Sequence, residues 1–209
     1  AADLLNEEEI ALIQTMRPGL IQLEIGVQST NPDTVKEIHR TMDFEKVSEN
    51  VRAVQKNGNV HQHLDLIAGL PYENLKSFHR SFNDVYALHP EQLQLGFLKV
   101  LKGSYMQEHQ AEYGLVVKNI PPYEVLYTDW LPYDDVLRLK GIEEMVEVYY
   151  NSGQFTQTMP ELEKYFKDPF IMYADMAAYY DKNGYFKINH RRAARYEILL
   201  EFVIEYAPE

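Results

Sequence analysis

The chain has 209 residues, of which 45% are hydrophobic and 25% charged, and it contains no cysteine. This is the composition of a globular protein, and the absence of thiols excludes a disulfide framework, a thiolate zinc site and an iron–sulfur cluster held by this chain. The formal net charge of −12 argues against a nucleic-acid partner. No apolar run is long enough to cross a bilayer and no secretory signal is evident, so we expect a cytoplasmic protein without a membrane partner.

The first half of the chain alternates helix and strand signals. The expected order is helix 3–16, strand 20–27, helix 32–39, helix 45–56, strand 60–68, helix 74–88 and strand 91–100. Such alternation is typical of parallel strands joined by right-handed crossovers. Three strands cannot close a barrel, so the expected α/β fold is part of an open sheet or about three units of a (β/α) barrel. In both architectures ligands bind at the carboxyl ends of the strands.

The second half of the chain is expected to be mostly helical. Short extended pieces are expected at 115–117 and 123–127, and helices at 133–151, 159–166, 170–183 and 191–206. Most of the 16 tyrosines lie beyond residue 120, where they either pack the helices on a scaffold or line a substrate site. We therefore expect two domains, an α/β domain at 1–106 and a mostly helical domain at 107–209.

The clearest chemical signal lies in "HQHLDLIAGLP", residues 61–71. Alternation along a strand places His61, His63, Asp65 and Ile67 on one face. The carboxylate of Asp65 needs a partner in this apolar run. It either satisfies backbone groups of the next loop or accepts hydrogen bonds from a ribose. A third interpretation is a barrel metallohydrolase, because a His-x-His pair on a barrel strand resembles the start of an amidohydrolase-type metal site.

Taken in order, three segments resemble the second half of a radical S-adenosylmethionine (SAM) enzyme core. They are "LEIGVQSTNPDTVKEIHR" (23–40), "HLDLIAGLPYEN" (63–74) and "LQLGFLKVLKGSYM" (93–106). In pattern they are similar to oxygen-independent coproporphyrinogen oxidases and cobalamin-binding radical SAM proteins. The stretch "PPYEVLYTDWLPYDDVLRLKGIEEMVEVYYNSGQF" (121–155) is similar to a C-terminal domain of unknown function found in one cobalamin-binding subgroup. The resemblance implies that 1–106 is half of a radical SAM (β/α) barrel.

The resemblance also implies a set of SAM-binding residues. Gln28 would contact the ribose or the methionyl part, and Arg40 would pair with the methionine carboxylate, for which a guanidinium fork is suited. Asp65 would bind the ribose hydroxyls. Residues 29–31 are expected to form a turn and the cap of the next helix. The adenine ring is expected near the remaining four residues, Ile67, Ala68, Leu98 and Val100.

The missing cysteines are a departure from this family. A radical SAM enzyme holds a 4Fe–4S cluster with the motif CxxxCxxC, which this chain lacks. The sequence also has no initiator Met, so we expect a C-terminal fragment that cannot cleave SAM by itself. The full-length enzyme would reductively cleave SAM under anaerobic conditions, using an electron donor, and start radical chemistry on an unknown small-molecule substrate. A cobalamin domain upstream is a further expectation.

The alternative from a different functional class is a non-enzymatic binding or interaction module. In that case a degenerate barrel half would pack against a partner, and the tyrosine-rich helices would form the interface. In either case a half barrel leaves open strand edges, through which we expect the chain to dimerise.

Overall fold

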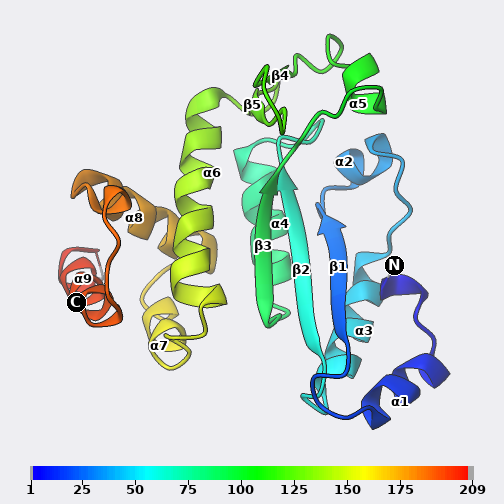
Figure 1. Cartoon of the computed structure of the whole chain (residues 1–209), viewed down its shortest axis with the longest axis horizontal. Helices are drawn as coiled ribbons and strands as arrows, with labels where there is room; N and C mark the ends of the chain where they lie inside the picture. The colour runs from blue at the N-terminus through cyan, green and yellow to red at the C-terminus, as the bar shows by residue number, and fades with distance from the viewer. Residues whose placement is uncertain (1, 207–209) are drawn as a thin grey trace. The chain divides into compact units, whose positions relative to one another are not determined.

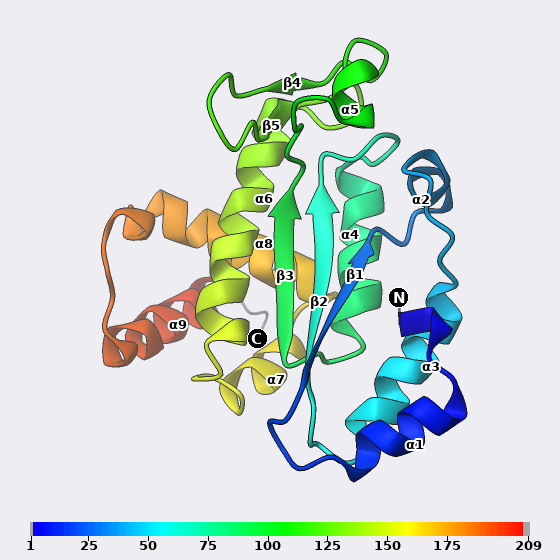
Figure 2. The same ribbon diagram turned by 45° about the vertical axis from the view of Figure 1, so that its right-hand side comes forward.

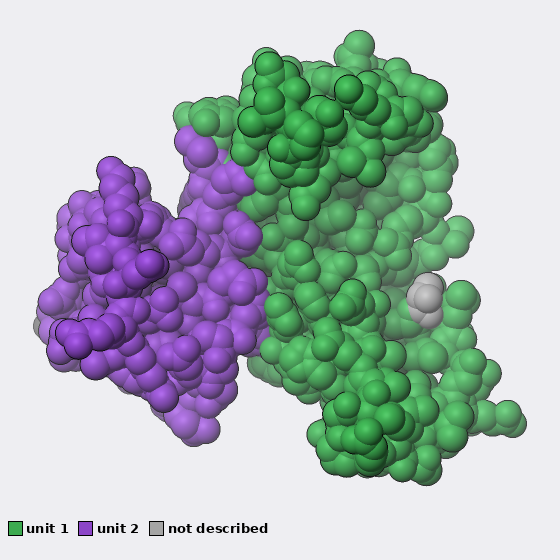
Figure 3. Space-filling view, viewed as in Figure 1, with its two compact units in different colours: residues 1–136 green, residues 137–209 purple. Residues whose placement is uncertain are grey.

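A computed structural model describes residues 2–206 of the chain. The chain divides into two compact units between Val136 and Leu137 (Figure 3). The expected domain boundary between residues 106 and 107 stays a prediction.

The first unit is built on a parallel sheet of three strands in the order β1-β2-β3 (Figures 1 and 2). The strands are β1 (Gln22–Gln28), β2 (His61–Ala68) and β3 (Gln92–Phe97). Helices α2 (Pro32–Glu37) and α3 (Phe44–Gln55) join β1 to β2, and α4 (Leu75–Tyr86) joins β2 to β3. This confirms the expected α/β fold of about three strand–helix units of a partial barrel.

The start of the chain differs from the single helix expected over residues 3–16. A short 3-10 helix η1 (Ala2–Leu4) comes first, and α1 (Glu7–Thr15) follows. The break falls at Asn6, whose side chain accepts a hydrogen bond from the Glu9 amide at 2.9 Å, while the Glu9 carboxylate accepts one from the Asn6 amide at 3.0 Å. This capping box requires an extended backbone at Asn6, so the helix begins at Glu7.

The two faces of the sheet differ in chemistry. One face carries buried apolar side chains, Val27, Leu64, Leu66, Leu93 and Leu95, and is covered by α3 and α4 (Figure 2). The other face carries the polar residues and glycines, Glu24, Gly26, His61, His63, Asp65, Gln94 and Gly96. The predicted alternation along β2 is therefore confirmed, and Asp65 lies on the face that the helices leave open.

The segment after β3 continues the hydrogen bonding of the sheet beyond the carboxyl ends of β2 and β3. The Leu98 amide donates to the Ala68 carbonyl at 2.9 Å, and the Val125 amide donates to the Leu98 carbonyl at 2.8 Å. Strands β4 (Val116–Val117) and β5 (Val125–Tyr127) form an antiparallel pair, which confirms the two expected extended pieces. The short helix α5 (Tyr105–Glu108) was not expected from the sequence.

The second unit is helical. It begins within α6 (Tyr133–Val146), a helix that starts in the first unit and continues into the second. Five further elements follow α6 along the described part of the chain. They are a π-helix η2 (Glu147–Asn151), α7 (Thr158–Glu163), α8 (Pro169–Lys182), a 3-10 helix η3 (Tyr185–Lys187) and α9 (Arg192–Tyr206). Tyr149, Tyr173 and Tyr180 are buried, and the hydroxyl oxygens of Tyr149 and Tyr180 lie 2.5 Å apart. These three tyrosines therefore pack in the core of the helices, as expected if the tyrosines serve packing, and they do not line a substrate site. No helix within residues 2–206 has the length and apolar character that a membrane crossing requires.

Candidate ligand-binding site

The carboxyl end of β1 is a tight turn centred on Gln28. Its φ is 71°, in the left-handed region that non-glycine residues rarely adopt, and the Ser29 amide donates to the Val27 carbonyl at 2.9 Å. A hydrogen bond across one residue with this φ defines a γ-turn, which is rare and strained. The register between β1 and β2 also shifts between Gly26 and Gln28. Strain of this kind at the ligand end of a strand is a mark of functional sites.

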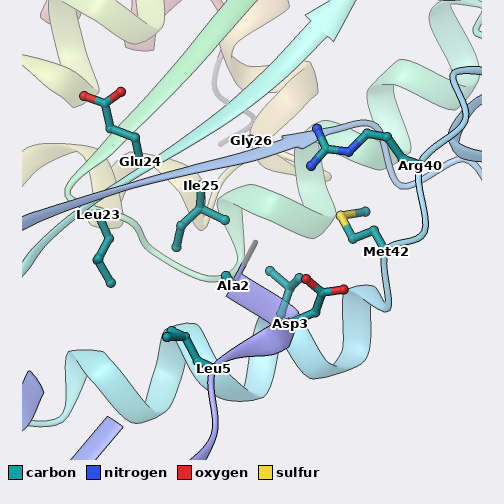
Figure 4. A pocket seen from close by; sticks show the side chains of 10 residues that line it. Ala2, Asp3, Leu5, Leu23, Glu24, Ile25, Gly26, Arg40 and Met42 are labelled. Carbon is teal, nitrogen blue, oxygen red and sulfur yellow. The ribbon is translucent and has the colours of Figure 1, made fainter. Parts of the chain in front are cut away.

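Gly26 is the point where three of the sequence-predicted residues meet. A Cβ atom at Gly26 would lie 2.8 Å from Gln28 Nε2, 3.6 Å from Arg40 Nη1 and 3.6 Å from Asp65 Oδ2. These side chains come from the end of β1, the segment after α2, and the middle of β2. Arg40 reaches across β1 beside Gly26 in Figure 4. The glycine leaves the space in which an amide, a guanidinium and a carboxylate come together.

The three polar groups have few partners in the protein. Within residues 2–206, the amide of Gln28 and the guanidinium of Arg40 form no hydrogen bond or ion pair with other side chains or backbone. Asp65 has an ion-pair partner in His63, with 3.8 Å between Nε2 and Oδ1. Half-buried polar groups that converge with few protein partners are what a polar ligand requires.

The protonation of Asp65 is set by opposing effects. Burial raises the pKa of the Asp65 carboxyl; next to that effect, His63 lowers it, Glu24 raises it and Arg40 lowers it. A ligand that donates hydrogen bonds to this carboxylate, or excludes Glu24 from it, would favour the ionised form.

Two cavities adjoin these groups. One, of about 450 Å³, runs along the free edge of β1 and is lined by Gly26 and Arg40 together with apolar residues such as Met42 (Figure 4). The other, of about 290 Å³, lies at the carboxyl ends of β2 and β3 and is lined by residues that include Asp65, Ile67 and Leu98. The cluster over Gly26 therefore has open space on both sides.

Two of the expected adenine-binding residues line neither of these cavities. Ala68 is buried on the helix-covered face of β2, and its carbonyl accepts the hydrogen bond from Leu98. Val100 is also buried, and its amide donates to the Tyr123 carbonyl at 3.0 Å. Any part that these two residues play in ligand binding is thus through packing and backbone geometry.

An aromatic cluster lies over the carboxyl ends of the strands. Tyr105 stacks on His109 with ring centroids 3.9 Å apart, and the Tyr113 hydroxyl donates to Glu37 at 2.5 Å. The rings of Tyr72, in the loop after β2, and Trp130 lie 4.6 Å apart. These contacts tie the segment after β3 to the loops after β1 and β2.

Residues 29–31 form loop structure, as expected. Asn31 caps α2, with its side-chain oxygen accepting from the Asp33 amide at 3.3 Å. Ser29 is fully buried and donates to Glu73 at 2.9 Å. Glu73 was not predicted as a site residue, and the available signal in the sequence was an acidic residue directly after the "GLPY" turn.

The metal-site interpretation finds no support in this geometry. His61 is exposed at the start of β2, away from the carboxyl end. No group of three His, Asp or Glu side chains within residues 2–206 is placed to share a metal ion. A barrel metallohydrolase is therefore not favoured.

Comparison with known protein families shows what the chain is similar to. Residues 2–85 match the radical SAM superfamily. This part of the chain, less than half of its length, is similar to the radical SAM superfamily. Residues 111–209 match a protein family of unknown function, DUF4080. The resemblance that the sequence carries to radical SAM enzymes is thereby confirmed, and an interaction module unrelated to that enzyme family is not favoured.

Individual curated relatives match only part of the chain. The oxygen-independent coproporphyrinogen-III oxidase-like protein HemZ of Bacillus subtilis (strain 168) is 29% identical over 111 residues, 53% of this chain and 22% of HemZ. The oxygen-independent coproporphyrinogen III oxidase of Helicobacter pylori (strain J99) is 35% identical over 75 residues, 36% of this chain and 16% of the oxidase. The chain therefore matches less than a quarter of the length of these two curated relatives.

A solved structure shares the fold. The radical SAM methyltransferase TsrM from Kitasatospora setae, solved with cobalamin and a 4Fe–4S cluster, superposes with a TM-score of 0.52 at 13% identity, covering 83% of this chain and 41% of TsrM. At this identity the likeness concerns the fold alone. It agrees with a partial radical SAM barrel followed by a helical region.

Proposed function

We propose that this chain forms one side of the SAM-binding pocket of a radical SAM enzyme. The observation that carries the proposal is the convergence of Gln28, Arg40 and Asp65 over Gly26. Apart from the ion pair of Asp65 with His63, these side chains have no hydrogen-bond or ion-pair partner among the described residues. SAM combines a carboxylate, a ribose diol and a flat adenine. The cluster offers a group of matching chemistry for each of the two polar parts.

Each side chain has a defined role in this proposal. The guanidinium of Arg40 donates two parallel hydrogen bonds to the methionine carboxylate. The carboxylate of Asp65 accepts hydrogen bonds from the ribose hydroxyls, as acidic residues of nucleotide sites do. The amide of Gln28, which both donates and accepts, lies close to both groups and contacts the ribose or the methionyl part.

The adenine would lie in the cavity at the ends of β2 and β3. Ile67 and Leu98 supply apolar surface there, and Gly96 lines the cavity without a side chain that would fill it. Ala68 and Val100 support this wall from behind through packing. The carboxyl ends of the strands would also receive the small-molecule substrate.

The 4Fe–4S cluster does not fit the residues of this chain. It is held by thiolates in this family, and the chain has no cysteine. When bound, the cluster supplies the electron that cleaves SAM, so both the cluster and its electron donor must come from outside these 209 residues. The chain by itself is expected to bind the nucleoside but to leave SAM intact.

As a separate proposal, a cobalamin-binding domain lies upstream in the full-length enzyme. It rests on the similarity of residues 121–155 to a domain attached to cobalamin-binding proteins and on the DUF4080 match. The complete native sequence and the cobalamin content of the purified native protein test it.

Titration calorimetry with S-adenosylhomocysteine, which is stable and keeps all three chemical parts, tests the proposed pocket. We expect the chain to bind this probe, and Arg40→Ala and Asp65→Asn each to weaken binding about tenfold or more. Arg17→Ala and Asp181→Asn, at exposed positions, are matched controls that should leave affinity unchanged. No binding by the wild-type chain, or equal affinity in all four variants, would contradict the proposal.

A further inference from the structure

A buried polar network lies behind the end of β1. Glu73 is 1% exposed, and its Oε1 accepts hydrogen bonds from the hydroxyls of Ser29 at 2.9 Å and Ser81 at 3.2 Å. Thr30 joins the same network, because its amide donates to the Ser81 hydroxyl at 3.0 Å and its hydroxyl to Asp84 at 2.6 Å. The network thus links the end of β1, the loop after β2 and helix α4.

This network holds the residue that follows the strained turn. Gln28 is at the centre of the γ-turn, and Ser29 closes it through the hydrogen bond from its amide to Val27. A strained backbone persists only where the surrounding contacts determine it. Ser29 is fully buried, and its side chain is held by Glu73. The hydroxyl of Ser29 also accepts from the Asn31 amide at 3.0 Å, so the chain is fixed on both sides of it.

We propose that Glu73 is a positioning residue, which through Ser29 holds the γ-turn that places the Gln28 amide over Gly26. The value of this position for SAM binding rests on the proposed function, whereas the hold on the turn itself does not. Without the hydrogen bond to Glu73, the backbone at Gln28 relaxes toward negative φ. The Gln28 amide then moves away from Arg40 and Asp65.

The choice of a carboxyl group fits this role. One oxygen, Oε1, accepts from two hydroxyls on different elements, which a shorter side chain, or one without an acceptor oxygen, would not do. The other oxygen, Oε2, is buried and has no hydrogen-bond partner. A buried polar atom without a partner lowers the free energy of unfolding, so packing alone does not explain a glutamate at this position. Burial raises the pKa of Glu73 to about 7, while the hydrogen bonds from Ser29 and Ser81 and the charge of Arg80 lower it.

Amide hydrogen exchange measured by NMR on the ligand-free chain tests the hold on the turn. We expect exchange at the Ser29 amide to be about tenfold faster or more in both Glu73→Ala and Ser29→Ala. Glu73→Gln keeps the accepting oxygen and should remain within about twofold of the wild type. Asn59→Ala removes a buried polar side chain far from the turn, and is the control for general destabilisation.

The outcomes separate the alternatives. If Glu73→Ala does not fold, Ser29→Ala removes the other end of the same hydrogen bond and decides the result. Unchanged exchange at Ser29 in the variants that fold, or the same acceleration in Asn59→Ala, would overturn the positioning role.

A double-mutant cycle with S-adenosylhomocysteine tests the consequence for binding. We expect Glu73→Ala to weaken the affinity about tenfold in the wild-type background and hardly at all in the Gln28→Ala background. In the Arg40→Ala background, Glu73→Ala should still weaken the affinity nearly as much as in the wild-type background. Equal losses in all three backgrounds would overturn a role through Gln28. If the wild-type chain does not bind the probe, the proposed function fails, and the exchange experiment still decides whether Glu73 holds the turn.

Discussion

Arg40 and Asp65, 25 residues apart in the sequence, approach the same point above β1. Arg40 Nη1 and Asp65 Oδ2 each lie 3.6 Å from the position that a Cβ of Gly26 would occupy. The two groups have opposite charges and form no ion pair with one another within the described residues. This separation leaves room for a ligand that has an acid for one and hydroxyl donors for the other.

Gly26→Ala should damage the site more than the fold. The new Cβ would meet Gln28 Nε2 at 2.8 Å, and the end of this flexible side chain can move aside. The backbone at Gly26 does not have a positive φ, so we expect a loss of stability below about 1 kcal/mol. Affinity for S-adenosylhomocysteine should fall at least about tenfold, because Gln28 is displaced. Calorimetry and urea denaturation measure the two effects.

Gln157→Ala, at an exposed position in the helical unit, is the comparison for this variant. It changes no atom of the polar cluster or of the two cavities, so affinity and stability should stay close to those of the wild type. Equal affinity losses in the two variants, or a large loss of stability in Gly26→Ala, would contradict the assigned geometry.

The sequence predicted the faces of the sheet well because period-two alternation is a local property. The resemblance to radical SAM enzymes implied that Gln28, Arg40 and Asp65 form one site, and the structure brings these three side chains together over Gly26. Their role in binding SAM stays a prediction. The alternation also shows in hindsight why Ala68 does not line the adenine cavity: it is next to Ile67 and therefore points to the opposite face.

Other features depend on contacts between residues distant in sequence. The γ-turn at Gln28 has no glycine at its centre, so the sequence contains no local signal for it. Glu73, whose carboxylate accepts the hydrogen bond from Ser29, is 44 residues away in the sequence. The helix α5 is a single turn supported by ring contacts of Tyr105 with His39 and His109. The helix break at Asn6 is the exception, since Asn6 and Glu9 form a capping box whose spacing the sequence does contain.

The stability of the chain should depend on pH through Glu73. Burial raises the pKa of Glu73 from its ordinary 4.5 to about 7, so the folded state binds a proton more tightly than the unfolded state. The free energy of unfolding should therefore fall as the pH rises from about 4.5 to about 7, and level off above that. At about 1.4 kcal/mol per pH unit, the upper limit of this change is about 3 kcal/mol.

Urea denaturation at pH 5 and pH 8 measures this change. Glu73→Gln cannot ionise, so its difference in stability between the two pH values should be smaller than that of the wild type. The same difference in both proteins would show that Glu73 does not titrate in this range.

Tyr113→Phe should loosen the aromatic cluster over the site. Tyr113 is buried, and its hydroxyl donates to Glu37 and lies 3.2 Å from that of Tyr105. Removal of the hydroxyl leaves Glu37 without this donor, at a cost of about 1–2 kcal/mol. Limited proteolysis should cut the segment 105–113 faster in this variant. Tyr165→Phe, at an exposed position, is the control and should be cut at the wild-type rate.

The open edges of the sheet should make the chain self-associate. Within residues 2–206, β1 and β3 each pair along one side only, with β2. Light scattering after size-exclusion chromatography should show a mass that increases with concentration. Lysine on edge strands blocks such pairing, so Gln22→Lys with Gln94→Lys should lower the mass, and Gln157→Lys should not. A monomer at all concentrations would contradict association through these edges.

NMR titration of the isotope-labelled chain with S-adenosylhomocysteine tests the central claim most directly, because it reports where the ligand binds. We predict chemical-shift changes at the amides of Gly26, Gln28, Arg40, Asp65 and Ile67, with no more than small changes beyond residue 136. Absence of shifts at saturating ligand, or shifts gathered in the helical unit instead, would contradict a SAM site formed by Gln28, Arg40 and Asp65.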